Sequence, residues 1–463
     1  MFRLGHRRQA VDDGAVDIVG ATGGEELIPG HWELVAALVK PVLQQLDAVR
    51  KQRRVEGKPE LTSEDLEQQA HGVIVAAAQE TITEMAERGM PQPTVAQEQR
   101  LVTDVFASMF RGGRLQALLD DQQLEGIEIN GCDEVFVRYP DGRRVPAAPV
   151  AETDEELIET VRRLATYHGL NPRHWDPTNW QLDVRLKDGA RVSAVMGVSA
   201  RPIVNIRRHR LVKVTLEDLV GNGTLAPELA EFLAAVVRAR KNVVIGGKTG
   251  AGKTTLLRAL INAIDPAERL VTIENALELG IRGLRDLHPN VVEFEARLPN
   301  VEGVGAVTMT DLVRRTLRMD ADRVIVGEVL GREIVAMLQA MSQGNEGSLS
   351  TIHARYAWDV IDRMVMYAEQ DPQLTERRIA KAVDFIVFLR RSSSQDRADG
   401  DGRRFVDRVL EVAHYDPATP QGVATNEIWQ PGEDGVAARD LATQIICMPE
   451  LRAVGYTDQE WRP

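Results

Sequence analysis

The feature that most constrains this chain is the segment GGKTGAGKTT, which begins at residue 246. It follows a short apolar run over residues 242–245 and precedes a stretch rich in Leu, Ala and Ile. A strand, a G-x-x-x-x-G-K-T loop and a helix in this order are typical of a phosphate-binding loop, whose backbone N–H groups surround phosphate oxygens. The N-terminus of the helix adds partial positive charge. All parts stand in order, so we prefer this interpretation to a plain glycine-rich turn.

The residue types in this loop predict how each one contacts a nucleotide. Lys253 is expected to reach the β- and γ-phosphates, and the hydroxyl of Thr254 is expected to bind Mg²⁺. The residues expected to bind the nucleotide are Gly247, Lys248, Thr249, Gly250, Ala251, Gly252, Lys253, Thr254 and Thr255.

A nucleotide hydrolase also needs a carboxylate that orients the attacking water. The apolar run 324–326 is followed by Gly327, where an aspartate is usual, and then by Glu328. We therefore predict that Glu328 positions the water and coordinates Mg²⁺ through water. A second apolar run, 270–273, precedes Glu274 and Glu278. Strand C-termini line the ligand-binding edge of such sheets, so Glu278 is expected to join Thr254 and Glu328 at the metal. The alternative for either acid is a solvated side chain.

Periodicity divides the chain into five stretches. Residues 1–30 are expected to be a flexible tail, and 31–120 a helical module in which Thr62 with Asp65 and Thr94 with Gln97 begin two helices. Period-two runs predict an α+β domain over 121–212 and a linker over 213–225. From 226 to 463, short apolar strands separated by helices predict an α/β domain with a mostly parallel sheet, followed by further strands and a polar loop at 392–403.

Composition excludes several function classes. The 463 residues carry 56 Lys and Arg against 69 Asp and Glu, a net charge of −13. This acidity argues against a dedicated nucleic-acid-binding protein, and we expect no direct nucleic-acid partner. Two cysteines exclude a disulfide framework and fit a reducing compartment. The apolar runs fall far short of the roughly 18 residues of a spanning helix. We expect a cytoplasmic protein that reaches a membrane only through a partner.

Four segments together resemble the secretion-superfamily ATPases, which drive type II and type IV secretion and type IV pili. They are GGKTGAGKTTLL, TIENALEL, VRRTLRMDADRVIVGEVLG and LQAMSQGNEGSLSTIHA. The resemblance is greatest to the CpaF-type motors of tight-adherence (Flp) pili and covers about residues 120–430. It implies a RecA-like P-loop ATPase domain, ATP and Mg²⁺ as cofactors, a homo-hexamer, and an inner-membrane platform protein as partner.

The same resemblance implies roles for individual residues. TIENALEL matches the acidic box of the family, so Glu274 and Glu278 carry over, and the strand ending in Glu328 matches the Walker B element. GSLSTIHA matches the histidine box, which makes His353 a sensor of the γ-phosphate. The chain departs from the family where Asn275 replaces an aspartate, Asn345 a histidine and Leu330 an arginine. The residues Lys253, Thr254, Glu278, Glu328 and His353 are nevertheless all retained, which favours a live but slow or specialised ATPase over an inactive one.

Arginines of the α+β domain complete the expected site. In the family, arginines at the positions of Arg191, Arg207 and Arg208 contact nucleotide, some from the adjoining subunit, and a solvated basic strand edge is the alternative. The basic run also includes Arg201, Arg210 and Lys213. Three functions stay open: a Flp-type pilus motor, a conjugation or type IV secretion ATPase, and a nucleotide-gated assembly scaffold with little turnover.

Overall fold

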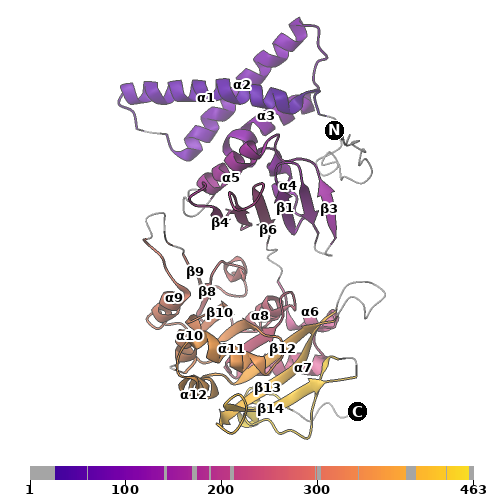
Figure 1. The fold of residues 1–463 in the computed structure, drawn as a ribbon, viewed down its shortest axis with the longest axis vertical. Coiled ribbons are helices and arrows are strands. Elements are labelled where there is room, and N and C mark those ends of the chain that lie inside the picture. Colours follow the sequence, from indigo (N-terminus) through magenta and orange to yellow (C-terminus); the bar gives the residue numbers. More distant parts are fainter. Residues whose placement is uncertain are drawn as a thin grey trace, which may run out of the picture. The chain divides into compact units, whose positions relative to one another are not determined.

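The computed structural model describes residues 27–457, apart from 60, 140–142, 169–174, 187–188, 209–212, 298, 300–303, 343, 393–402 and 434. The expected tail at 1–30 and the expected loop at 392–403 therefore lie almost entirely outside the described residues. The chain divides into two compact units, Met1–Arg210 and Leu211–Pro463 (Figure 1).

The first unit begins with three helices, α1 (His31–Val55), α2 (Ser63–Glu87) and α3 (Val95–Phe110). The two helix starts expected from the sequence are confirmed. The Thr62 hydroxyl accepts a hydrogen bond from the backbone N–H of Asp65, and Thr94 and Gln97 form a reciprocal capping box. Apolar residues of all three helices, among them Val42, Ile74 and Leu101, are fully buried against one another.

The described residues of this unit also form a six-stranded antiparallel sheet with strand order β3-β2-β1-β6-β5-β4. Helix α5 (Asp154–His168) packs near it. The strands are β1 (Gly126–Asn130), β2 (Val135–Arg138), β3 (Arg144–Ala147), β4 (Gln181–Arg185), β5 (Arg191–Val195) and β6 (Ile203–Arg207).

The helical module and the α+β part have separate hydrophobic clusters, and the residues just before position 120 belong to the cluster of the α+β part. Leu115 of η2 (Gly113–Leu115) and Leu118 and Leu119 of α4 (Gln116–Asp120) pack into the core of the α+β part. Arg114 also lies over the ring of Trp32 in α1 and pairs with Glu152. Helical module and sheet therefore belong to one compact unit.

The second unit contains a sheet that has nine strands in the described residues, in the order β15-β14-β13-β12-β7-β11-β10-β8-β9. The part from β12 to β9 is parallel, and the rest is antiparallel, which confirms the expected α/β class. The strands are β7 (Val243–Gly247), β8 (Leu270–Glu274), β9 (Val291–Glu295), β10 (Arg323–Val329), β11 (Leu349–His353), β12 (Phe385–Arg391), β13 (Arg404–Tyr415), β14 (Val423–Pro431) and β15 (Ala437–Arg439).

Helices of this unit bury apolar faces against the sheet in two separate hydrophobic clusters. They are α6 (Leu216–Gly221), α7 (Pro227–Arg238), α8 (Lys253–Asn262), η3 (Ile281–Gly283), α9 (Met309–Thr316), α10 (Glu333–Ser342), α11 (Asp359–Ala368), α12 (Pro372–Ala382) and α13 (Met448–Ala453). Among the described residues, none of the helices combines the length and the apolar character that crossing a bilayer requires.

The stretch 213–225, expected to be a linker, is instead part of the second unit. Thr215 and Asp218 form a capping box that begins α6. Leu216, Leu219 and Leu225 are buried in the same hydrophobic cluster as α7 and α8. A helix of six residues is too short to show a clear helical period in the sequence, and the three leucines anchor the segment.

Candidate nucleotide site

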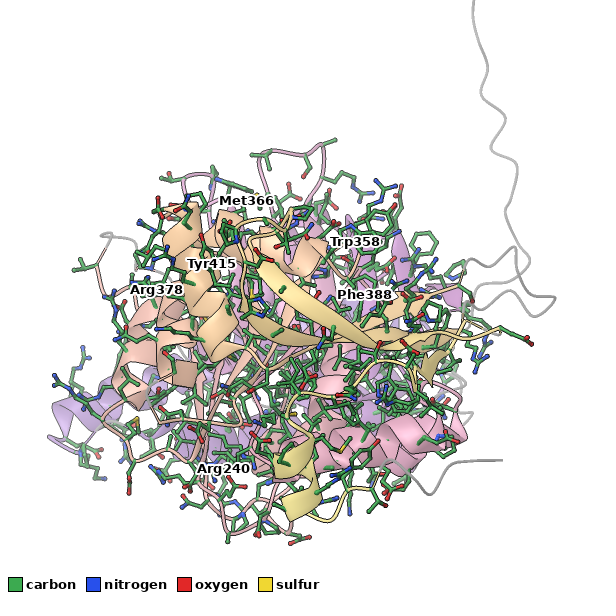
Figure 2. All side chains as sticks on the ribbon, turned by 90° about the horizontal axis from the view of Figure 1, so that it is seen from below. Arg240, Trp358, Met366, Arg378, Phe388 and Tyr415 are labelled. Atoms are coloured by element: carbon green, nitrogen blue, oxygen red, sulfur yellow. The ribbon has the colours of Figure 1, made fainter. Side chains whose placement is uncertain are left out.

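The glycine-rich loop joins the fully buried strand β7 to α8, as the sequence predicts. Gly250 (φ 75°) and Gly252 (φ 98°) adopt left-handed backbone conformations that residues with a side chain rarely take. A Cβ at Gly246 would lie 2.5 Å from Val360 Cγ2 and 3.0 Å from Cδ2 of Phe388, so only glycine fits there. Figure 2 labels Phe388 among the side chains of this unit. The first turn of α8 leaves backbone N–H groups without intrahelical acceptors. The loop is therefore shaped to receive phosphate.

Three predicted residues come together beside this loop. Lys253 is buried, and its Nζ lies 3.0 Å from Nδ1 of His353. Nε2 of His353 lies 2.6 Å from Oε1 of Glu328. An ammonium can only donate, so Nδ1 accepts from Lys253 and the Nε2–H donates to Glu328. We call these residues the Lys253–His353–Glu328 cluster.

Strand order explains why residues a hundred positions apart meet. Strand β11 lies between β7 and β10, and all three are parallel. Their C-terminal ends therefore share one edge of the sheet, which is where ligands bind in parallel α/β folds. His353 ends β11 and pairs in register with Gly247 at the end of β7. It consequently stands between the glycine-rich loop and the acid on β10.

Burial perturbs two members of the cluster. Desolvation lowers the pKa of Lys253, and the negative charge of Glu328 partly offsets this. Desolvation and the positive charge of Lys253 lower the pKa of His353, whereas Glu328 raises it. A neutral imidazole and a partly desolvated ammonium would both gain from an approaching polyanion.

Glu274 occupies the space beside Gly327. It is buried at the end of β8, and its carboxylate accepts hydrogen bonds from the backbone N–H groups of Glu278 and Leu279. Burial raises its pKa to about 7. A Cβ at Gly327 would lie 2.7 Å from Glu274 Cγ. The usual aspartate position is therefore a glycine because the Glu274 side chain packs against it.

The metal ligands expected from the sequence are less well defined. Thr254 lies in the first turn of α8, next to Lys253, and is half-buried. Glu278 is half-buried, its backbone N–H is bonded to Glu274, and its carbonyl accepts from Arg258 of α8. The part of the chain that the structure describes contains no group of three or more His, Cys, Asp or Glu side chains suited to a metal. A site of Thr254, Glu278 and Glu328 that shares Mg²⁺ with phosphate oxygens stays a prediction.

The Thr351 side chain also helps to position the site, and we did not predict this from the sequence. Its hydroxyl donates to the carbonyl of Gly327 at 2.8 Å, which ties β11 to the segment that carries Glu328. A buried threonine within the run STIHA, two residues before His353, is the signal that could have identified it.

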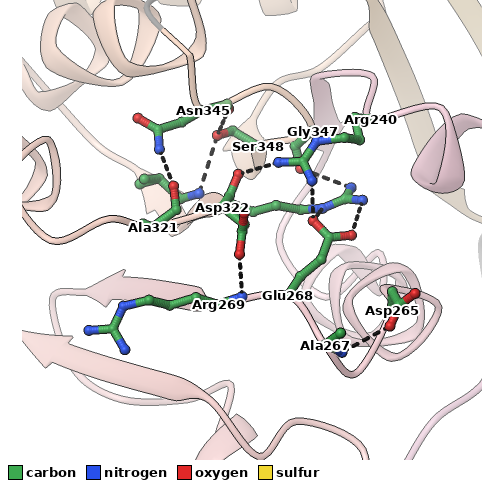
Figure 3. A network of polar contacts seen from close by, with 12 residues as sticks. Arg240, Asp265, Ala267, Glu268, Arg269, Ala321, Asp322, Asn345, Gly347 and Ser348 are labelled. Carbon is green, nitrogen blue, oxygen red and sulfur yellow. Dashed lines mark hydrogen bonds and ion pairs between the residues drawn. The ribbon is translucent and has the colours of Figure 1, made fainter.

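Of the departures from the family pattern, Asn345 lies far from this edge in the sheet. Its amide donates to the carbonyl of Ala321 at 2.6 Å, at the N-terminal ends of β10 and β11 (Figure 3). Asn275 is exposed directly after β8. Leu330 is 48% exposed, and its backbone N–H is bonded to Glu333.

The predicted arginines lie in the first unit. Arg191 of β5 and Arg207 of β6 are register partners, and Arg207 is exposed. Arg208 donates to the carbonyl of Asp121. Arg201, which the basic run had included, is held by Asp154 and Asp133 and therefore fixes a loop of its own unit. Nucleotide contacts of Arg191, Arg207 and Arg208 stay predictions.

Comparison with known proteins adds independent findings. Residues 130–432 match the family described as type II/IV secretion system protein. A putative conjugal transfer protein of Mycobacterium tuberculosis is 33% identical over 345 residues, 71% of this chain and 92% of that protein. Conjugal transfer protein TrbB of Rhizobium radiobacter is 32% identical over 344 residues, 73% of this chain and 98% of that protein. The solved VirB11 ATPase of the Brucella suis type IV secretion system, in complex with sulphate, is 25% identical; the match covers 68% of this chain and 96% of that one, with a TM-score of 0.34.

Proposed function

Because the chain belongs to the type II/IV secretion system protein family, we propose that it hydrolyses ATP and that hydrolysis drives protein transport or pilus assembly. The observation that carries the proposal is the Lys253–His353–Glu328 cluster beside the glycine-rich loop. It joins a phosphate-binding cation to a carboxylate through one imidazole. A phosphate-binding loop alone would explain binding, whereas the carboxylate also explains hydrolysis.

The chemistry follows from the position of each group. The Lys253 ammonium neutralises charge on the β- and γ-phosphates, which stabilises the transition state of phosphoryl transfer. Glu328 accepts a hydrogen bond from the attacking water and orients it in line with the breaking bond. His353 holds the Glu328 carboxylate at 2.6 Å and can turn its Nε2–H toward a phosphate oxygen. In this way it would report the presence of the γ-phosphate.

Mg²⁺, when bound, would neutralise further charge on the phosphates. The Thr254 hydroxyl is the ligand that the loop supplies directly, and Glu328 and Glu278 would act through bound water, since Mg²⁺ usually keeps several waters. The buried Glu274 carboxylate, which two backbone N–H groups hold in place, supports the Glu278 segment.

Glu328→Gln tests the hydrolytic function. The amide keeps the shape of the side chain but cannot act as a carboxylate, so ATP should bind and persist while hydrolysis is lost. Steady-state phosphate release and retention of radiolabelled ATP measure the two effects. Glu369→Gln is the matched control, because Glu369 makes an exposed ion pair with Arg332 on the surface. Normal hydrolysis by Glu328→Gln would refute the assignment and make Glu278 the candidate acid.

The assembly we propose is a homo-hexamer in which arginines of one subunit serve the nucleotide of the next. Arg207→Ala and Lys253→Ala should each be nearly inactive. Mixed rings would contain some interfaces with an intact loop and a neighbour that supplies Arg207, because a guanidinium stabilises the transferring phosphoryl whichever chain provides it. Pull-down of one tagged variant with the other verifies that mixed rings form. Partial activity of these mixed rings supports the proposal. Confirmed mixed rings without activity above either parent would contradict it.

The most specific part of the proposal is the process that the ATPase drives. The motif resemblance favours assembly or retraction of a Flp-type pilus through an inner-membrane platform protein, with the chain on the cytoplasmic side. Its similarity to a putative conjugal transfer protein and to conjugal transfer protein TrbB favours conjugal transfer instead. A pull-down with the membrane proteins encoded next to its gene separates the two, since a pilus platform and a conjugation channel are different partners. If turnover proves negligible while ATP binds, the nucleotide-gated scaffold replaces both.

A further inference from the structure

Strand β13 contains one residue more than its partner β12 close to the point where β12 passes the glycine-rich loop. In this antiparallel pair, Phe388 faces Arg408, and the next residue along β12, Leu389, faces Val406. Asp407 is therefore an extra residue on β13, which makes this place a β-bulge. We call it the Asp407 bulge.

The Asp407 bulge decides which face of the sheet the beginning of β13 presents to the loop. Side chains alternate between the two faces of a strand, so an extra residue moves all residues beyond it to the opposite face. Val409 and Val406 show the switch, because they are three positions apart and yet both belong to the hydrophobic cluster that contains α8. Arg404, two positions before Val406, consequently lies on the face of α8 and the glycine-rich loop.

Arg404 makes a direct contact with the loop from this position. Its Nε donates a hydrogen bond to the Gly250 carbonyl at 3.0 Å. The N–H of the same peptide group belongs to Ala251 and donates to the Lys248 carbonyl at 3.2 Å. The Lys248 carbonyl also accepts a hydrogen bond from Nζ of Lys253 at 3.4 Å. Both polar ends of one peptide group are thus held, and they connect Arg404 to the cation that is proposed to bind phosphate.

The strand that carries this side chain is itself held in place. The Val406 side chain is fully buried, and the Val406 backbone N–H donates to the Thr224 carbonyl at 2.9 Å. The Asp407 side chain is 3% exposed, and it pairs with Arg408 at 2.8 Å and with Arg390 at 3.2 Å. Two guanidinium groups therefore compensate the buried charge at the bulge. A side chain on such a supported strand can fix the position of a loop.

We propose that Arg404 is a positioning residue, which holds the glycine-rich loop in its phosphate-receiving conformation before a nucleotide arrives. This inference rests on the proposed function. Glycine loses more conformational freedom on ordering than any other residue, so an unsupported loop would lose this freedom when the nucleotide binds. A loop that is ordered in advance binds more tightly. The gain is the same for ATP, for ADP and for the transition state, so it lowers KM and leaves kcat unchanged.

Hydrogen exchange of the nucleotide-free protein tests the positioning directly. Arg404→Ala should speed exchange of the amides of residues 248–253 by about twofold to tenfold, the effect of losing one hydrogen bond. Arg404→Lys should keep part of the protection, because an ammonium can donate to the same carbonyl. Arg390→Ala is the matched control on the same hairpin. Its side chain is 60% exposed and on the other face of the sheet, and Arg408 still compensates Asp407 in this variant.

Nucleotide binding and kinetics test the consequence of the positioning. In calorimetric titration, Arg404→Ala should weaken ADP binding by about threefold to tenfold, and Arg390→Ala should stay within about twofold of native protein. The KM for ATP should rise by the same factor in Arg404→Ala, with kcat within about twofold of native. A role in overall stability alone would instead lower the fraction of folded protein, and with it the apparent kcat, at unchanged KM.

The outcomes separate this inference from the proposed function. Weaker ADP binding by Arg404→Ala with native exchange of the free loop would overturn the positioning role, because Arg404 would then act on the nucleotide itself. Native ADP affinity and native exchange in Arg404→Ala would overturn this inference alone. Native protein that binds neither ATP nor ADP would overturn the proposed function.

Discussion

The N-terminal and the C-terminal ends of the parallel strands in the second unit both carry buried charged side chains. The two ends differ in whether these side chains form ion pairs. At the N-terminal ends, the Arg323 side chain is 1% exposed and forms two hydrogen bonds with Glu268. Glu268 also accepts from Arg240, whose guanidinium reaches the Asp322 carbonyl. At the C-terminal ends, Lys253 and Glu274 are buried, and within the part of the chain that the structure describes neither of them forms an ion pair.

The difference lies in whether opposite charges meet within the protein. Glu268 lies between two guanidinium groups, so the charges of the N-terminal end compensate one another. Burial instead lowers the pKa of Lys253 and raises the pKa of Glu274. Perturbed pKa values of this kind are typical of functional sites. The N-terminal end therefore serves stability, whereas the C-terminal end is arranged to receive a charged ligand.

The largest expected effect comes from removing the cation at the C-terminal end. Lys253→Ala should reduce hydrolysis by at least about a hundredfold, because it removes a charge that stabilises the transition state. The free energy of unfolding should change by no more than about 1 kcal/mol, since no ion pair is broken. Phosphate release and urea unfolding measure the two quantities. Near-normal turnover would end the assignment of the phosphate-binding loop.

The opposite pattern is expected at the N-terminal end. Glu268→Ala leaves the buried Arg323 charge without its partner, which should lower the free energy of unfolding by roughly 3–5 kcal/mol. Hydrolysis per folded molecule should be unchanged, because Glu268 lies at the other edge of the sheet. Asp265→Ala, an exposed change on a neighbouring turn, is the control and should cost no more than about 1 kcal/mol. A selective loss of kcat in Glu268→Ala would break the comparison.

An effect of intermediate size is expected at Glu274, whose titration should make the free energy of unfolding depend on pH. The folded-state pKa of Glu274 is about 7, against an ordinary value of 4.5. Between these values the folded protein holds a proton that the unfolded chain has lost, so stability falls as pH rises through this window. Glu274→Gln removes this titration and should recover roughly 2 kcal/mol at pH 8 relative to native protein, while the two should agree more closely at pH 4. Urea unfolding of the native protein and the variant at pH 4 and pH 8 measures this difference. If the difference in the free energy of unfolding between variant and native protein were the same at both pH values, the raised pKa would be contradicted.

The smallest effect is expected at Asn275. Asn275→Asp restores the carboxylate of the family pattern on an exposed residue, so the fold should be unaffected. Hydrolysis should stay the same or rise by a small factor, because a carboxylate supports a Mg²⁺ shell better than an amide does. Turnover measured over a Mg²⁺ titration tests this. A large loss would show that the local site is built around the amide.

Prediction from sequence succeeded where the signal is local. The glycine-rich loop, the apolar run before Glu328 and the caps at Thr62 and Thr94 lie within a few residues of what they determine. It failed at 213–225, where a six-residue helix is too short to show a period and is anchored by distant leucines. It also could not recognise that Arg201 is bound by acids from other segments.

By itself, the sequence determined the prediction of a phosphate-binding loop in the second unit, because the spacing of glycines, Lys253 and Thr254 is a local pattern that needs no distant partner. Only the tertiary structure decided which residues face that loop. Placing β11 between β7 and β10 brings His353 between Lys253 and Glu328, and placing β12 on the other side brings Arg404 to the Gly250 carbonyl. The room for Glu274 beside Gly327 likewise depends on two strands becoming neighbours. Strand order arises from packing of the whole sheet against its helices, and no local pattern of residues encodes it.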